Sequence, residues 1–154
     1  MRTRTILAAP VLFLAGIALC LAADAHMGTW KLNEAKSKFS PGATKNMTVV
    51  YEAAGENVKV TVDGVDKDGK PVHQVWVGKF DGKDYPVTGE NNYDSRAYTK
   101  VDDHTMDMTI KMGGKLVGTG KITVAADGKS RTVTTKATDP KAAGLNATAV
   151  YDKQ

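Results

Sequence analysis

Residues 104–125 read His104-Thr-Met-Asp-Met-Thr-Ile-Lys-Met-Gly-Gly-Lys-Leu-Val-Gly-Thr-Gly-Lys-Ile-Thr-Val-Ala125. In the first half of this stretch an apolar residue occupies every second position, which is typical of a β-strand with one buried face. Gly113 and Gly114 separate the two halves, and glycine accepts the positive φ angles that tight hairpin turns require. The stretch therefore predicts an antiparallel hairpin of residues 104–112 and 115–125.

The same period of two recurs along the chain, between short turns that contain glycine and aspartate. It predicts ten strands, of which the fifth is short enough to be only a bend: 27–32, 45–53, 57–63, 71–80, 84–88, 92–101, 104–112, 115–125, 130–138 and 145–152. One short helix is expected at residues 33–39, with Asn33 as its N-cap. No longer run has helical periodicity, so the sequence offers no crossover helices for a parallel sheet.

These strands predict an all-β fold. A series of hairpins leaves unpaired edge strands unless the sheet closes on itself or stacks on a second sheet. We therefore expect an antiparallel up-and-down β-barrel of about eight to ten strands, with a β-sandwich as the alternative. A chain of 154 residues, 42% hydrophobic and 25% charged, is typical of one globular domain.

The first 25 residues carry the features of a secretory signal peptide in the usual order. Arg2 and Arg4 supply positive charge, residues 6–21 form an apolar run, and Ala23-Asp24-Ala25 is a small-x-small cleavage site. We expect residues 1–25 to be removed on export to the periplasm or the extracellular space. Residues 26–154 then remain as a single domain. Cleavage after Ala23 is the nearest alternative.

Two kinds of membrane attachment fit this segment less well. The apolar run from residue 6 to residue 21 is shorter than the roughly 20 residues that span a bilayer, and Pro10 interrupts it. Cys20 follows Leu19 rather than a small residue, unlike the acceptor cysteine of a bacterial lipoprotein. We therefore expect no stable membrane insertion after cleavage.

Cleavage of the signal peptide also limits the chemistry of the mature domain. It removes Cys20, the one cysteine of the chain, and with it thiol catalysis and disulfide bonds. Removal of Arg2, Arg4 and Asp24 from the 21 basic and 17 acidic side chains leaves a net charge of about +3. Because that charge is dispersed, no nucleic-acid partner is predicted.

No catalytic residue, metal site or cofactor is predicted. The histidines match no local metal-ligand spacing: His26, His73 and His104. The acidic pairs fall in turns, where aspartate is favoured because its side chain hydrogen-bonds to the backbone. The glycines form neither a phosphate-binding loop nor a dinucleotide fingerprint.

Gly28-Thr29-Trp30 opens the first predicted strand and resembles the Gly-x-Trp signature of lipocalins. The resemblance implies a barrel in which Trp30 plugs one end beneath a small-molecule cavity, so that Gly28 and Trp30 are structural. Lipocalins also carry a late arginine that packs over this tryptophan, and the last predicted strand has no arginine. Further segments are similar to exported bacterial proteins of unknown function, which implies no activity: 27–39, 80–89 and 150–154.

The hairpin of residues 104–125 suggests the character of the interior. One face carries methionines at 106, 108 and 112, and the next strand adds Leu116, Ile122 and Val124 with glycines between them. Flexible thioethers opposite positions without side chains predict an apolar, adaptable interior, with no ionised group on this face. We expect the cavity to be lined by Trp76, Tyr93, Met106, Met108, Ile110, Gly118 and Gly120.

The sequence therefore predicts a secreted, non-catalytic protein that binds a small apolar or amphipathic molecule. A neutral lipophile or the tail of an amphiphile is favoured over a sugar or a nucleotide. One alternative is a structural or protein-interaction barrel with a filled core, and a less favoured one is an enzyme that uses the barrel cavity. An internal volume of about 300 Å³ or more favours the binding protein. A buried pair of titratable groups with shifted pKa values favours the enzyme.

Overall fold

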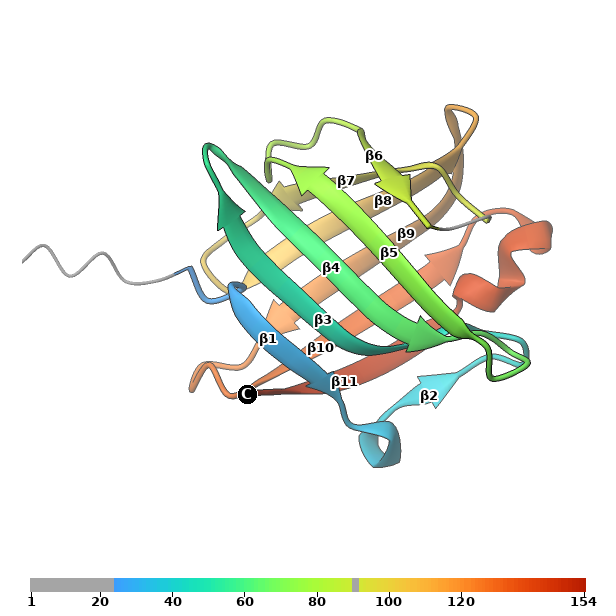
Figure 1. Ribbon diagram of the computed structural model, residues 1–154, viewed down its shortest axis with the longest axis horizontal. Helices are drawn as coiled ribbons and strands as arrows, with labels where there is room; N and C mark the ends of the chain where they lie inside the picture. Colours follow the sequence, from blue (N-terminus) through green and yellow to red (C-terminus); the bar gives the residue numbers. More distant parts are fainter. Residues whose placement is uncertain (1–23, 90–91) are drawn as a thin grey trace, which may run out of the picture.

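The computed structural model describes residues 24–89 and 92–154, which form an all-β, closed antiparallel barrel (Figure 1). Along these residues the secondary-structure elements are β1 (Gly28–Leu32), η1 (Glu34–Lys36), β2 (Lys38–Phe39), β3 (Lys45–Ala54), β4 (Asn57–Val65), β5 (Pro71–Gly78), β6 (Tyr85–Thr88), β7 (Ser95–Lys100), β8 (Thr105–Met112), β9 (Lys115–Val124), β10 (Ser130–Ala137), η2 (Pro140–Leu145) and β11 (Ala147–Lys153). Both η elements are short 3₁₀ helices.

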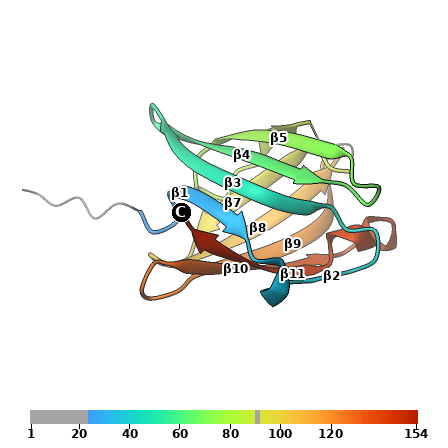
Figure 2. The same ribbon diagram turned by 60° about the horizontal axis from the view of Figure 1, so that its bottom comes forward.

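The barrel is a simple meander that its first strand closes. From β3 to β11 each strand pairs with the next, and β1 pairs with β3 on one side and β11 on the other. Figure 2 shows the curved wall that results. The remaining strand, β2, lies beside β11 and pairs with it through Phe39 and Ala147. The predicted up-and-down barrel is confirmed, and the alternative β-sandwich is wrong.

Each predicted strand corresponds to a barrel strand, and the short fifth strand predicted at 84–88, with a bend as its alternative, is β6. The helix predicted at 33–39 is wrong beyond its first turn. Asn33 does cap that turn, since its side chain accepts a hydrogen bond from the Lys36 N–H at 3.3 Å. Ser37 is already extended, and its hydroxyl donates to the Asn33 carbonyl at 2.7 Å, so the chain leaves the helix and continues as β2.

The hairpin of β8 and β9 turns at Gly113 and Gly114, whose φ angles are +57° and +76°. Opposite Ile110 and Lys111 the register shifts, because β9 has one extra residue, Val117, between their partners Gly118 and Leu116. Beyond it Met112 is 37% exposed and Leu116 is 39% exposed. The expectation that these two residues share the inner face is therefore wrong, although Met106, Met108 and Ile110 do point inward.

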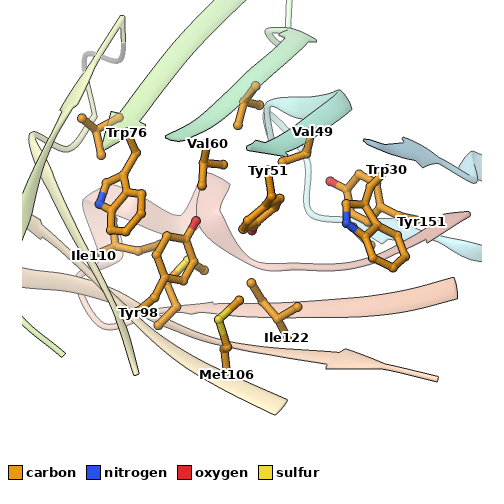
Figure 3. Close-up of a cluster of buried hydrophobic side chains, with 14 of the residues drawn as sticks. Trp30, Val49, Tyr51, Val60, Trp76, Tyr98, Met106, Ile110, Ile122 and Tyr151 are labelled. Carbon is orange, nitrogen blue, oxygen red and sulfur yellow. The ribbon is translucent and has the colours of Figure 1, made fainter. Parts of the chain in front are cut away.

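Inward-pointing side chains form one hydrophobic core, with large aromatic rings at its centre (Figure 3). The Trp76 ring meets the Tyr98 ring edge to face, with centroids 4.8 Å apart. The Trp76 indole N–H donates to the Arg96 carbonyl at 2.9 Å, so this buried ring also satisfies its polar group. These contacts fill part of the barrel with side chains.

Trp30 closes one end of the barrel. Its ring has no exposed surface, and its indole N–H donates to the His26 carbonyl at 2.9 Å. The guanidinium carbon of Arg131 lies 4.7 Å from the centroid of the Trp30 ring. An arginine therefore does pack over this tryptophan, but it comes from β10 rather than from the last strand, where the sequence resemblance placed it.

We predict that Trp30→Ala destabilises the protein by about 3–5 kcal/mol, because truncation of a buried tryptophan leaves a cavity that the closed sheet cannot collapse to fill. Urea unfolding followed by far-UV circular dichroism measures the loss. Lys31→Ala is the matched control, since Lys31 is the exposed neighbour on the same strand. An equal effect of both substitutions would show that the Trp30 ring is peripheral.

Acid should weaken the closed end through His26, which is fully buried. Burial lowers the pKa of His26 to about 4, helped by the positive charges of Arg131, Lys100 and His104 and opposed by Asp24. The folded state therefore binds fewer protons than the unfolded state between pH 6.5 and 4. We predict that about 2–3 kcal/mol of stability is lost as the pH falls through this window.

Urea unfolding at half-unit steps of pH tests this prediction. His26→Gln is neutral at every pH, so its free energy of unfolding should vary less between pH 6.5 and 4 than that of the wild type. If the free energy of unfolding depends on pH equally in the two proteins, folding does not lower the pKa of His26.

Candidate functional site

A cavity of about 260 Å³ occupies the part of the barrel that the aromatic core leaves open. Its wall includes Tyr51 and Tyr151, which are buried, and it reaches the surface at Gly42, Asn92 and Gly144, which are exposed. The cavity therefore opens at the end of the barrel that carries η2 and the loop before β3, away from Trp30.

Only some of the residues expected to line a cavity do so. Tyr93, Met108 and Ile110 belong to its wall. Trp76 and Met106 are buried in the core, at 1% and 0% exposure, and are not part of the wall.

The two glycines expected in the lining, Gly118 and Gly120, lie on β9 beside the wall rather than in it. A Cβ atom at Gly118 would lie 2.9 Å from the Leu145 side chain. At Gly120 it would lie 2.5 Å from the terminal methyl carbon of Met108. The space beside Gly118 is therefore filled by the Leu145 side chain, and the space beside Gly120 by the Met108 side chain.

The wall is partly apolar, as the sequence predicts. Met108, Ile110 and Ile122 contribute from β8 and β9, and Val133 and Leu145 contribute from β10 and η2. Together they supply a surface suited to an alkyl chain or a ring. Leu145 comes from the short helix η2, which periodicity does not predict because its six residues are too few to show a pattern.

The wall also carries two buried arginines that the sequence analysis missed. Arg96 of β7 is 6% exposed. Its Nη1 donates to the Tyr98 hydroxyl at 3.0 Å, and its Nη2 donates to the Tyr93 hydroxyl at 2.6 Å. The Tyr93 hydroxyl in turn donates to Oε1 of Gln74 at 2.7 Å. This network holds the guanidinium group against the cavity.

Arg131 is the second, at 2% exposure. Its guanidinium carbon lies 4.7–5.0 Å from the ring centroids of Trp30, Tyr51 and Tyr151. Such cation–π contacts favour the charge but use no N–H group. Nε and Nη1 of Arg131, and Nε of Arg96, have no hydrogen-bond partner among the described residues.

Within residues 24–89 and 92–154, no carboxylate forms an ion pair with either arginine. The described wall of the cavity holds three basic residues, with Lys141 at the mouth, and no aspartate, glutamate or histidine. An arginine side chain stays protonated in proteins, so the described part of the wall carries positive charge.

This finding corrects the expectation of a neutral interior. The prediction considered the face of β8 and β9, and the charges lie on β7 and β10. A signal was available, since Arg96 stands two positions before the buried Tyr98, and Arg131 two positions before Val133. Residues two apart on a strand share a face, so both arginines fall on the inward side.

Two tyrosines of the wall, Tyr51 and Tyr151, have pKa values raised by burial. Burial raises the pKa of Tyr151 to about 12. Burial, reinforced by the neighbouring Tyr98, also raises the pKa of Tyr51 above its ordinary value. Because the phenols keep their protons at neutral pH, they add no negative charge that would neutralise the arginines.

The described residues offer no arrangement for metal chemistry or for a helical membrane span. Within residues 24–89 and 92–154, no group of three or more histidine, cysteine, aspartate or glutamate side chains is placed to hold a metal ion. In the same part of the chain, no helix is both long and apolar enough to cross a bilayer.

Comparisons with known proteins give a likeness of fold. No protein-family model matches the chain, and no curated protein does. A solved structure of a redesigned β-barrel, mFAP1 bound to DFHBI, is 15% identical over 86% of this chain and 98% of that one, with a TM-score of 0.45. A second structure, EF1p2_mFAP2b bound to DFHBI, is 14% identical over 86% of this chain and 97% of that one, also with a TM-score of 0.45.

Proposed function

We propose that this chain is an exported, non-catalytic protein that binds one small amphipathic molecule in the barrel cavity. The observation that carries the proposal is the cavity itself, which combines an apolar wall with fixed polar groups and an opening at the surface. Ligand sites in proteins commonly have this composition. The described wall lacks a carboxylate, a histidine or a thiol, which supports binding rather than acid–base or nucleophilic catalysis.

The size of the cavity limits the ligand. Its volume of about 260 Å³ lies just below the range of about 300–1,000 Å³ that is usual for ligand sites. A medium-chain molecule or a small aromatic molecule fits this volume, whereas a large lipid does not. The structural module with a filled core draws support from the aromatic packing around Trp76, but that packing fills only part of the interior.

Contacts of Asp24 bear on the proposed export. Its carboxylate accepts a hydrogen bond from the His26 N–H at 3.0 Å and forms an ion pair with Lys100 at 2.9 Å. Its carbonyl accepts from the Met27 N–H at 3.0 Å. Cleavage after Ala25 would remove these contacts and leave a charged amine on the buried His26, which is costly. They support cleavage after Ala23.

We predict that the exported protein begins at Asp24. Expression of the full chain in a bacterium, recovery of the exported fraction and N-terminal sequencing measure the start. A start at His26 would contradict the role given to Asp24, and a start at Met1 would contradict export with cleavage.

We predict that a bulky residue at the mouth blocks ligand entry. Ala142 belongs to the wall of the cavity, whereas its neighbour Ala143 is exposed on the same helix. Ala142→Trp should weaken binding of the neutral dye N-phenyl-1-naphthylamine by about tenfold or more, equivalent to about 1.4 kcal/mol. Ala143→Trp should bind as the wild type does.

Fluorescence titration measures both variants, with the melting temperature of each as a check of folding. Wild-type protein that shows no saturable dye binding would contradict the binding function. Equal weakening by both substitutions would place the dye outside the cavity.

A further inference from the structure

We propose that the natural ligand is a monocarboxylic acid, bound as its anion with the carboxylate facing Arg96 and Arg131 and its apolar part along β8 and β9. This inference rests on the proposed binding function and adds the chemical class of the ligand. It departs from the neutral lipophile that the sequence predicts.

The charge of the described wall favours an anionic ligand. Burial of an unpaired cation is costly, and a buried cation is normally held by an anion or by a full set of hydrogen bonds. Arg96 and Arg131 are 6% and 2% exposed, and no described carboxylate pairs with either. A bound anion would compensate these charges.

The hydrogen-bond donors that remain favour a carboxylate. The Nη groups of Arg96 are held by Tyr93 and Tyr98, which fixes the plane of the guanidinium group. Three nitrogen atoms still have no described partner: Nε of Arg96 and Nε and Nη1 of Arg131. Both arginines belong to the wall of the same cavity. A carboxylate is a pure acceptor with two oxygens, and it forms strong charge-assisted bonds with such donors.

The rest of the wall favours a ligand with an apolar tail. The wall also has an apolar surface formed by Met108, Ile110, Ile122 and Leu145. This surface is stabilised by contact with an apolar tail, which a small inorganic anion does not have. At the mouth, Lys141 adds positive charge and no acidic side chain opposes it in the described wall. Such a charge attracts anions toward the opening.

The test compares two ligands that differ in the head group. Decanoate and decan-1-ol compete with N-phenyl-1-naphthylamine for the wild-type protein at pH 7.5. We expect decanoate to displace the dye at a concentration at least ten times lower than decan-1-ol. Arg96→Met, which keeps an unbranched side chain but removes the charge, should reduce this ratio to about one. Lys115→Met, which removes an exposed positive charge, should leave the ratio unchanged.

The outcomes separate the two proposals. Equal displacement by the acid and the alcohol in the wild type would overturn the carboxylate inference and leave the binding function intact. Absence of saturable dye binding would overturn both. Arg131→Met provides a second variant if Arg96→Met does not fold, and the ratio measured on the wild type decides the inference even if neither variant folds.

Discussion

Pairing of β1 with β11 closes the sheet, and the rest of the structure depends on that closure. In a closed sheet every second side chain points into one shared interior and none of these can turn to solvent. Burial of the inward-pointing apolar side chains stabilises the fold. The same inward orientation also buries Arg96 and Arg131. An open sheet or a sandwich edge would have allowed their guanidinium groups to reach water.

Closure divides the interior into two parts with different roles. Around Trp76 the space is filled by stacked and edge-to-face rings, and around Trp30 by the guanidinium group of Arg131. These contacts stabilise the fold. Toward η2 the filling is incomplete, and a cavity of about 260 Å³ remains. Arg131 belongs to both parts, since it packs on Trp30 and also lines the cavity. A single side chain thereby links the stability of the closed end to the charge of the ligand site.

The alternation of Met106, Met108 and Ile110 with polar residues was enough to predict the hairpin, and repetition of that pattern was enough to predict the barrel. The order of strands follows because consecutive hairpins pair in sequence. The inward facing of Arg96 was also readable from the same period of two. The hairpin of β8 and β9 alone does not reveal it, because the two arginines lie on β7 and β10.

Other features lie outside the reach of a local pattern. The position of the cavity depends on which side chains meet across the barrel, and those residues are far apart in the chain. Trp76 and Met106 fill the core while Tyr93 lines the cavity, although all three were expected in the lining. The register shift at Val117 and the six-residue helix η2 depend on tertiary contacts that the sequence does not display.

Arginine side-chain NMR tests the central claim most directly, because residues 24–154 contain only Arg96 and Arg131. In exported protein labelled with ¹⁵N-arginine, we expect two Nε–H signals that exchange slowly with water. Both signals should shift on addition of decanoate and neither on addition of decan-1-ol. Nε–H signals that exchange as fast as those of free arginine, or that do not move at saturating decanoate, would contradict the claim.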